Sequence, residues 1–254
     1  MKKFTRRRFL RAAFWGTPVA LATNAFCFEP EWLKVRTIRL VRSQPARRVV
    51  HFTDLHFKGN NRYLETVVAR INSLAPDLVC FTGDIIEDAP FLAPALKILG
   101  GIRSPLFGVP GNHDHWSHVD FAPIRECFAK TGGAWLVNET VELPGLGVKI
   151  LAIDRLPASL PPAPRLKNIL LIHYPEWADR LGSLRYDLIL AGHSHGGQVR
   201  IPFYGALMVP FSTGKYEVGL FKTASGPLYV NPGIGYFYVN VRFNCRPEIT
   251  VFEI

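Results

Sequence analysis

Short aliphatic runs recur along this chain, and each ends just before a group of Asp, Asn, His and Gly residues. Val, Ile, Leu and Phe dominate the runs, which lie at residues 48–53, 77–82, 106–109, 168–173 and 188–191. Runs of this length and composition are typical of buried strands. The pattern therefore predicts an α/β fold in which each polar group lies at the C-terminal end of a strand.

A predicted helix lies between the first two of these runs. Apolar residues between the first two runs recur at the period of a helix face, at Leu64, Val67, Val68, Ile71 and Leu74. Further helices are predicted at residues 91–99, 121–130 and 176–184. Residues 135–154 and 198–254 contain mostly strand-like segments. Alternating strands and helices, followed by segments that are mostly strands, indicate two sheets packed face to face with helices outside.

The polar groups contain side chains that bind metal ions. They are Asp54-Leu55-His56, Gly83-Asp84, Gly111-Asn112-His113-Asp114, His173 and Gly192-His193-Ser194-His195. Imidazole mixed with carboxylate suits Mn, Fe, Zn or Co, with Mn the expected metal, and these groups contain no thiolate. Two such ions can hold a phosphate and neutralise the charge of an in-line displacement. The set predicts two divalent ions that act in phosphate ester cleavage.

One carboxylate has to bind both ions if the ions are to lie close together. Asp84 is the natural bridge. Asp54, His56 and one histidine of the last pair complete the first ion, and Asn112, His173 and the other histidine complete the second. Any one of these motifs arises often by chance, so the prediction depends on all five occurring in order.

The order DLH, GD, GNHD, H and GHSH resembles the calcineurin-like metallophosphoesterases over residues 48–254. The resemblance implies an αββα sandwich of two mixed β-sheets flanked by helices. The segments GHSHGGQVRIP (residues 192–202) and NCRPEIT (residues 244–250) resemble a narrower branch of membrane-associated or exported bacterial phosphoesterases. That branch includes an enzyme that hydrolyses UDP-2,3-diacylglucosamine in lipid A synthesis.

The resemblance also implies a role for each matching residue. The first ion would be bound by Asp54, His56, Asp84 and His195. The second ion would be bound by Asp84, Asn112, His173 and His193. His113 matches a histidine that faces the phosphate and assists the leaving group, and Asp114 would orient it. Apart from the resemblance, Arg155 follows a predicted strand and suits bidentate binding of a second phosphate, although a merely solvated charge is the plainer alternative.

The formal charge of the chain is concentrated in its N-terminal segment. Residues 1–48 contain 12 Lys and Arg against two acidic residues, whereas residues 49–254 contain 18 of each sign. A nucleic-acid enzyme would carry a basic face on its folded domain. We therefore expect no nucleic-acid partner.

The N-terminus resembles a twin-arginine export signal. Thr5-Arg6-Arg7-Arg8-Phe9-Leu10-Arg11 precedes an uncharged run of 17 residues that ends at Phe28, which is short for a membrane-spanning helix. We expect a signal or anchor at residues 1–28, a basic linker at 29–47 and the catalytic domain at 48–254. Cleavage after Ala22 and retention as an anchor are both open. Six Lys and Arg in residues 34–48 would lie near anionic headgroups.

These features lead to one hypothesis and two alternatives. The leading hypothesis is a phosphodiester or pyrophosphate hydrolase at the bacterial inner membrane that acts on a glycolipid such as UDP-2,3-diacylglucosamine. The first alternative is a phosphodiesterase that the twin-arginine machinery exports to act on other envelope phosphoesters. The remote alternative is a metal-binding interaction module without turnover.

Overall fold

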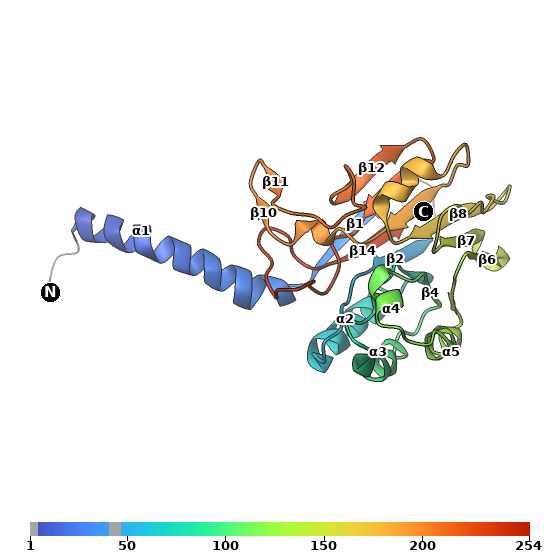
Figure 1. Ribbon diagram of the computed structural model, residues 1–254, viewed down its shortest axis with the longest axis horizontal. Coiled ribbons are helices and arrows are strands. Elements are labelled where there is room, and N and C mark those ends of the chain that lie inside the picture. The colour runs from blue at the N-terminus through green and yellow to red at the C-terminus, as the bar shows by residue number, and fades with distance from the viewer. Residues whose placement is uncertain (1–4, 41–46) are drawn as a thin grey trace.

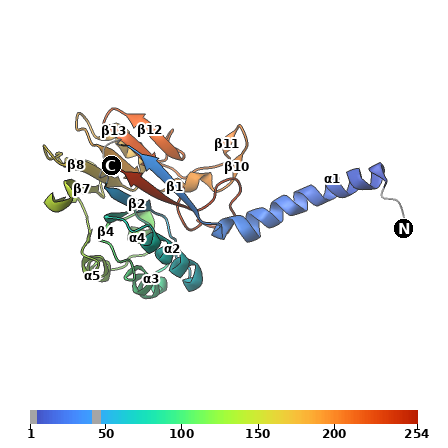
Figure 2. The ribbon, with the colours of Figure 1, turned by 180° about the vertical axis from the view of Figure 1, so that it is seen from behind.

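The computed structural model describes residues 5–40 and 47–254, which build two six-stranded sheets stacked face to face (Figures 1 and 2). In spatial order the first sheet contains β1 (Lys34–Arg39), β14 (Glu248–Glu253), β2 (Arg48–Phe52), β3 (Leu78–Phe81), β4 (Leu106–Gly108) and β5 (Ala134–Trp135). The second contains β12 (Gly219–Thr223), β13 (Gly226–Val230), β9 (Leu188–Ala191), β8 (Lys167–Ile172), β7 (Val148–Ile153) and β6 (Glu139–Leu143).

Both sheets mix parallel and antiparallel pairs. In the first sheet β2, β3, β4 and β5 run parallel to one another, and β14 is antiparallel to β2. In the second sheet β7, β8, β9 and β13 are parallel, while β6 and β12 pair antiparallel at the two edges. The predicted αββα class with two mixed sheets is thereby confirmed.

Apolar side chains fill three layers. The middle layer lies between the sheets and joins residues such as Cys80 and Phe252 of the first sheet to Ile150 and Leu190 of the second. Another layer packs the first sheet against helices α2 (Asn61–Ser73), α3 (Leu92–Leu99) and α5 (Ala122–Lys130). Four of the apolar positions predicted for α2 are buried, and the Asn60 side chain accepts the Tyr63 N–H at its start.

The outer face of the second sheet has a thinner cover. The helix predicted at residues 176–184 is a 3₁₀ helix, η5 (Pro175–Arg180), which begins at a proline. Its Ala178 belongs to the third apolar layer, together with Leu170 and Ile189 of the second sheet. Gly182 has a φ of 66°, a left-handed conformation that stops a helix.

The N-terminal segment forms α1 (Arg6–Thr23) and a π-helical turn (Asn24–Phe28), and extends away from the sheets (Figure 1). Across the described residues, no helix combines the length and apolarity needed to cross a bilayer. The assignment of residues 1–28 as a signal or anchor stays a prediction.

Part of the expected basic linker is a strand. β1 pairs in parallel with β14 from Lys34 to Arg39, and Arg39 bonds Glu253 at 2.6 Å. The folded domain therefore begins before residue 48. Alternating basic and apolar residues in this segment are typical of an edge strand, where charge is tolerated on the open side. Residues 41–46 of the linker lie outside the described residues.

Candidate metal centre

The polar groups predicted at strand ends meet at one edge of the sandwich. Asp54 and His56 follow β2, Asp84 follows β3, and Asn112 begins α4 (Asn112–Trp116) after β4. His173 follows β8, and His193 and His195 follow β9. The facing sheets bring these ends together, and all seven side chains are buried.

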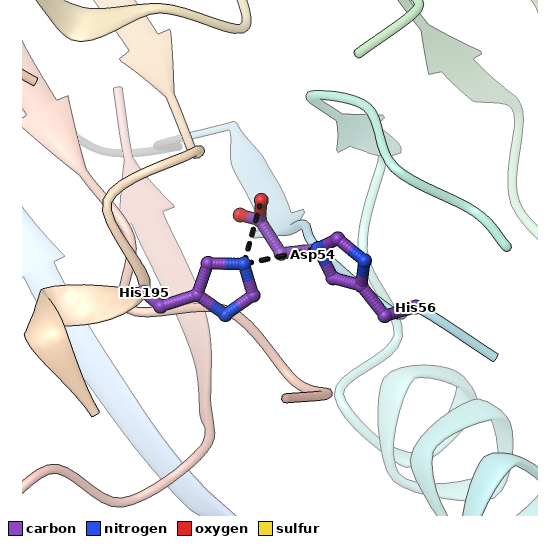
Figure 3. A group of neighbouring side chains, drawn as sticks. All are labelled: Asp54, His56 and His195. Atoms are coloured by element: carbon purple, nitrogen blue, oxygen red, sulfur yellow. Dashed lines mark hydrogen bonds and ion pairs between the residues drawn. The ribbon is translucent and has the colours of Figure 1, made fainter. Parts of the chain in front are cut away.

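One group of ligand atoms combines both sheets. Asp54, His56 and His195 each place a ligand atom within 4.8 Å of the others (Figure 3). The Nε2 atoms of His56 and His195 are 3.0 Å apart, and Nε2 of His195 is 3.6 Å from Oδ1 of Asp54. This is the first ligand set that the resemblance implies, apart from Asp84.

A second group lies beside the first. Asp84, His173 and His193 again place their ligand atoms within 4.8 Å of one another. Nε2 of His173 is 3.0 Å from Oδ1 of Asn112 and 3.1 Å from Nδ1 of His193. The amide oxygen of Asn112 therefore belongs with this group.

A single carboxylate oxygen joins the two groups. Oδ2 of Asp84 is 3.4 Å from Nε2 of His56 and 3.3 Å from Nε2 of His173. Its other oxygen accepts the backbone N–H of His113 at 2.8 Å, which fixes the carboxylate plane. The arrangement fits two divalent ions with Asp84 between them, as the predicted bridging role requires.

Outer hydrogen bonds orient the imidazoles. Nδ1 of His173 donates to the carbonyl of Thr82, and Nε2 of His193 donates to the carbonyl of Phe211, both at 2.6 Å. Nδ1 of His56 lies 2.8 Å from Glu87. Partners of this kind set which ring nitrogen faces a metal and raise its basicity.

The backbone at these positions is strained. Five of the seven candidates have positive φ: Asp54, His56, Asp84, His193 and His195. A non-glycine residue in this region costs about 1–3 kcal/mol and clusters at functional sites. Gly83, with a φ of 99°, lies so close to Gly111 that a Cβ would be 2.5 Å from the Gly111 nitrogen. Packing of the two motif loops thus holds the ligands in place.

The protonation states of the ligand histidines favour the binding of a cation. Burial, and then the charge of His56, lowers the pKa of His195 well below its usual value. Burial and His173 lower the pKa of His193 to about 3, so both rings are neutral near pH 7 and offer lone pairs. Burial also disfavours a charged His173, but Asp84 raises its pKa to about 9. The proton on that pair is one that a bound metal would displace.

The carboxylate beside His113 is Glu87, a residue outside the predicted site. Oε2 of Glu87 is 3.3 Å from Nδ1 of His113. Asp114 was predicted to orient His113, but its carboxylate accepts the backbone N–H groups of Gly111, Asp84 and Ile85 at 2.8–2.9 Å. Asp114 therefore holds the motif loops together. The position of Glu87 three residues after Asp84 was the available signal.

Arg155 lies at the periphery. Its side chain is 73% exposed and its guanidinium is 3.6 Å from Asp154, whose other oxygen is 2.7 Å from Nε2 of His115. No contact in the described residues links Arg155 to the seven ligand candidates. Its role in substrate binding stays a prediction.

A loop after β13 completes the site and was not predicted. Ile234 and Gly235 donate backbone N–H bonds to the carbonyls of Thr53 and Asp54. The Arg242 guanidinium is fully buried and donates to carbonyls of the same loop, at Pro232, Gly233, Gly235 and Cys245. This cation therefore stabilises the loop against the first metal motif.

Comparisons with known proteins find a family model and several relatives that match this chain. A family model described as calcineurin-like phosphoesterase matches residues 47–197. The uncharacterised metallophosphoesterase YkuE of Bacillus subtilis is 30% identical, over 100% of this chain and 99% of that protein. Phosphodiesterase YaeI of Escherichia coli is 28% identical, over 98% and 99%. A Bos taurus transmembrane protein with metallophosphoesterase domain is 29% identical, over 86% of this chain and 55% of that protein.

The family match spans more than half of the chain and includes all five metal-binding motifs. Two nearly full-length relatives are named as a metallophosphoesterase and a phosphodiesterase. This leaves no support for an interaction module without turnover. The chain belongs to the calcineurin-like phosphoesterase family and is a metal-dependent phosphoester hydrolase.

Proposed function

We propose that the enzyme hydrolyses a phosphodiester or pyrophosphate bond in a lipid-linked substrate at a membrane surface, with UDP-2,3-diacylglucosamine as the leading candidate. The observation that carries the reaction is the pair of buried ligand groups joined by Asp84. The name of the relative YaeI supports a diester, and the bovine relative's name supports a membrane location.

The ligands divide as the resemblance implies. Asp54, His56, Asp84 and His195 would hold one ion, and Asp84, Asn112, His173 and His193 the other. Bound divalent ions supply positive charge to the phosphoryl oxygens and so stabilise the transition state. Manganese is the proposed metal, since the mixed nitrogen and oxygen donors suit it as well as Fe, Zn or Co.

His113 is the proposed proton donor to the leaving group. Its Nδ1 faces Glu87, and its buried Nε2 has no hydrogen-bond partner among the described residues. The rings of Trp116 and Phe237 lie 4.9 and 5.3 Å from the His113 ring and limit the access of water. Burial lowers the pKa of His113, and the negative charge of a bound phosphate would favour the protonated ring.

The test is hydrolysis by the purified full-length protein with Mn²⁺. UDP-2,3-diacylglucosamine in mixed micelles is compared with bis-para-nitrophenyl phosphate, and His113→Gln is the matched variant. The proposal expects UMP and a lipid monophosphate at a rate well above that of the generic diester. Cleavage of the generic diester alone would reject the glycolipid as substrate.

The runner-up is an exported phosphodiesterase that acts on other envelope phosphoesters. The motif Thr5-Arg6-Arg7-Arg8-Phe9-Leu10-Arg11 favours it, since it resembles a twin-arginine signal. Fusing residues 1–40 to a folded reporter separates the two. Export of the reporter that disappears in Arg6→Lys/Arg7→Lys favours the runner-up, and retention in the cytoplasm favours a substrate on the inner leaflet.

A further inference from the structure

Large exposed hydrophobic side chains are unevenly distributed over the molecule. In the described residues, 16 of 18 lie in three segments, at residues 10–32, 201–211 and 238–239. We call the second and third segments the apolar rim. Its exposed members are Ile201, Phe203, Tyr204, Leu207, Met208, Phe211, Tyr238 and Val239. Apolar patches of this kind mark an interaction site.

The first part of the rim is fastened to a metal-binding motif. It comprises β10 (Arg200–Ile201), β11 (Gly205–Ala206) and the residues that follow. The Leu207 N–H donates to the carbonyl of Val199, and the carbonyl of Phe211 accepts from His193. Met208 and Phe211 are nevertheless 79% and 96% exposed. Rigid anchoring of the backbone thus presents apolar side chains to the outside.

The second part of the rim is fastened beside the first and last metal-binding motifs. Lys58 donates to the carbonyls of Tyr236 and Phe237, and the Gln198 side chain accepts the Phe237 N–H at 2.7 Å. The Phe237 ring covers His56 and His113, while its neighbour Tyr238 is exposed. Both parts of the apolar rim therefore adjoin the metal centre.

The charge around the apolar rim and the position of the rim relative to α1 indicate what kind of partner it contacts. Between Asp187 and Glu248 the sequence contains a single acidic residue, Glu217, which pairs with Arg200 at 3.0 Å. β10 and β11 lie on the side of the domain from which α1 extends (Figures 1 and 2). That helix begins with the exposed residues Arg6 and Arg7 and exposes Phe14 and Trp15. Basic residues beside aromatic ones are typical of segments that lie in an anionic membrane interface.

We propose that the apolar rim inserts into an anionic bilayer and seats the metal centre on the lipid surface. This deepens the proposed function and rests on it, because a lipid-linked phosphate would reach the ions from the membrane beside the rim. α1 would tether the same side of the molecule. The rim, rather than the tether, would set the orientation of the catalytic edge.

The direct test uses the full-length protein with fluorescent probes. Cys27 is the exposed cysteine and the other three are buried, so Cys27→Ser gives a background for labelling. An environment-sensitive dye is placed through Met208→Cys, and through Leu220→Cys as a control, since Leu220 is exposed outside the rim. Vesicles contain phosphatidylglycerol and phosphatidylethanolamine with brominated acyl chains.

The proposal expects bromolipid quenching several-fold stronger at position 208 than at position 220 in vesicle-bound protein. Equal quenching would overturn it, because α1 would then be the whole attachment. Emission at position 208 that changes with protein concentration and without vesicles would also overturn it, in favour of contact with a second copy.

Activity separates the failure of this inference from failure of the proposed function. Phe203→Glu/Met208→Glu should lower hydrolysis of a vesicle-embedded lipid nucleotide at least about tenfold, as expected from losing the burial of two large apolar side chains. Hydrolysis of bis-para-nitrophenyl phosphate should not change, and Leu220→Glu should match wild type on both substrates. Lipid turnover that survives in the double variant contradicts the seating. Absence of lipid turnover in wild type with strong quenching at position 208 contradicts only the substrate.

Discussion

The metal centre and the apolar rim adjoin one another but are built on opposite principles. In the metal centre seven polar side chains are buried, five of them on strained backbone, and hydrogen bonds hold their positions. In the rim a well-anchored backbone exposes apolar side chains whose own contacts are few. Single substitutions should therefore disrupt the metal centre severely, whereas the rim should depend on the summed apolar area.

The largest effect is expected at Asp84, where one carboxylate belongs to both ligand groups. Asp84→Asn should lower hydrolysis of bis-para-nitrophenyl phosphate by far more than the 10–100-fold that is usual for loss of an outer partner. Metal content should fall below two ions per chain. Glu139→Gln, which changes an exposed ion pair with Arg125 and a surface hydrogen bond from the Val137 N–H, is the control. Two retained ions in Asp84→Asn would refute the bridge.

Asp114 should affect folding more than chemistry. Its carboxylate accepts three backbone N–H groups, so Asp114→Asn leaves a buried donor facing other donors. We expect a loss of about 2 kcal/mol in the free energy of unfolding. Denaturant titration of the metal-free protein measures it. A stable Asp114→Asn protein with a large loss of kcat would restore the predicted role in orienting His113.

Glu87 should affect chemistry more than folding. Glu87→Gln keeps the shape but removes the charge beside His56 and His113. We expect a decrease of about 10–100-fold in kcat or metal affinity, with little change in Tm. Kinetics at saturating Mn²⁺ separate an effect on kcat from an effect on metal affinity. Activity equal to wild type at all metal concentrations would remove Glu87 from the site.

His51 is a buried histidine outside the ligand set, and it should make the stability of the protein depend on pH. Burial lowers its pKa to about 3, and Nε2 bonds Thr82. Because the folded-state pKa lies below the usual 6.5, the unfolded chain takes up the proton first. Its stabilising contribution is complete above pH 6.5 and is lost as the pH falls toward 3. From pH 7 to 5 the metal-free wild type should lose about 2 kcal/mol more than His51→Gln. Identical pH slopes would contradict this.

The smallest effect is expected at the exposed Arg155. An exposed charge contributes about 1 kcal/mol or less, so Arg155→Ala should raise KM no more than about fivefold and leave kcat unchanged. Substrates with one and two phosphates should be compared. An equal change in KM for both substrates would contradict the predicted contact of Arg155 with a second phosphate.

Local sequence was sufficient for most of the fold and for the ligand candidates. Strand residues such as Leu78 and Leu188 lie in continuous apolar runs, and α2 has clear helical spacing, so their elements could be predicted. The ligand candidates follow such runs directly, and the structure brings all seven together. β1 was missed because Lys34, Arg36 and Arg39 look like a solvated stretch until β14 is placed beside them.

Contacts between distant segments decided the roles of some residues that the local sequence pattern could not assign. Glu87 and Asp114 are both acidic residues near a metal motif, and only the packing of the motif loops assigns one to His113 and the other to backbone amides. Phe203 and Met208 are large apolar residues, yet they are exposed in the segment after β9, whose Phe211 carbonyl contacts His193.

The sequence by itself determined the class of fold, the family and the residues that can bind two metals, because period, composition and motif order are local properties of the chain. The tertiary structure alone decided that Glu87 faces His113 and that an apolar rim flanks the site. Both facts depend on contacts between segments that are distant in the chain, because Glu87 and His113 follow neighbouring strands of the first sheet and the rim is anchored to Val199 and Gln198.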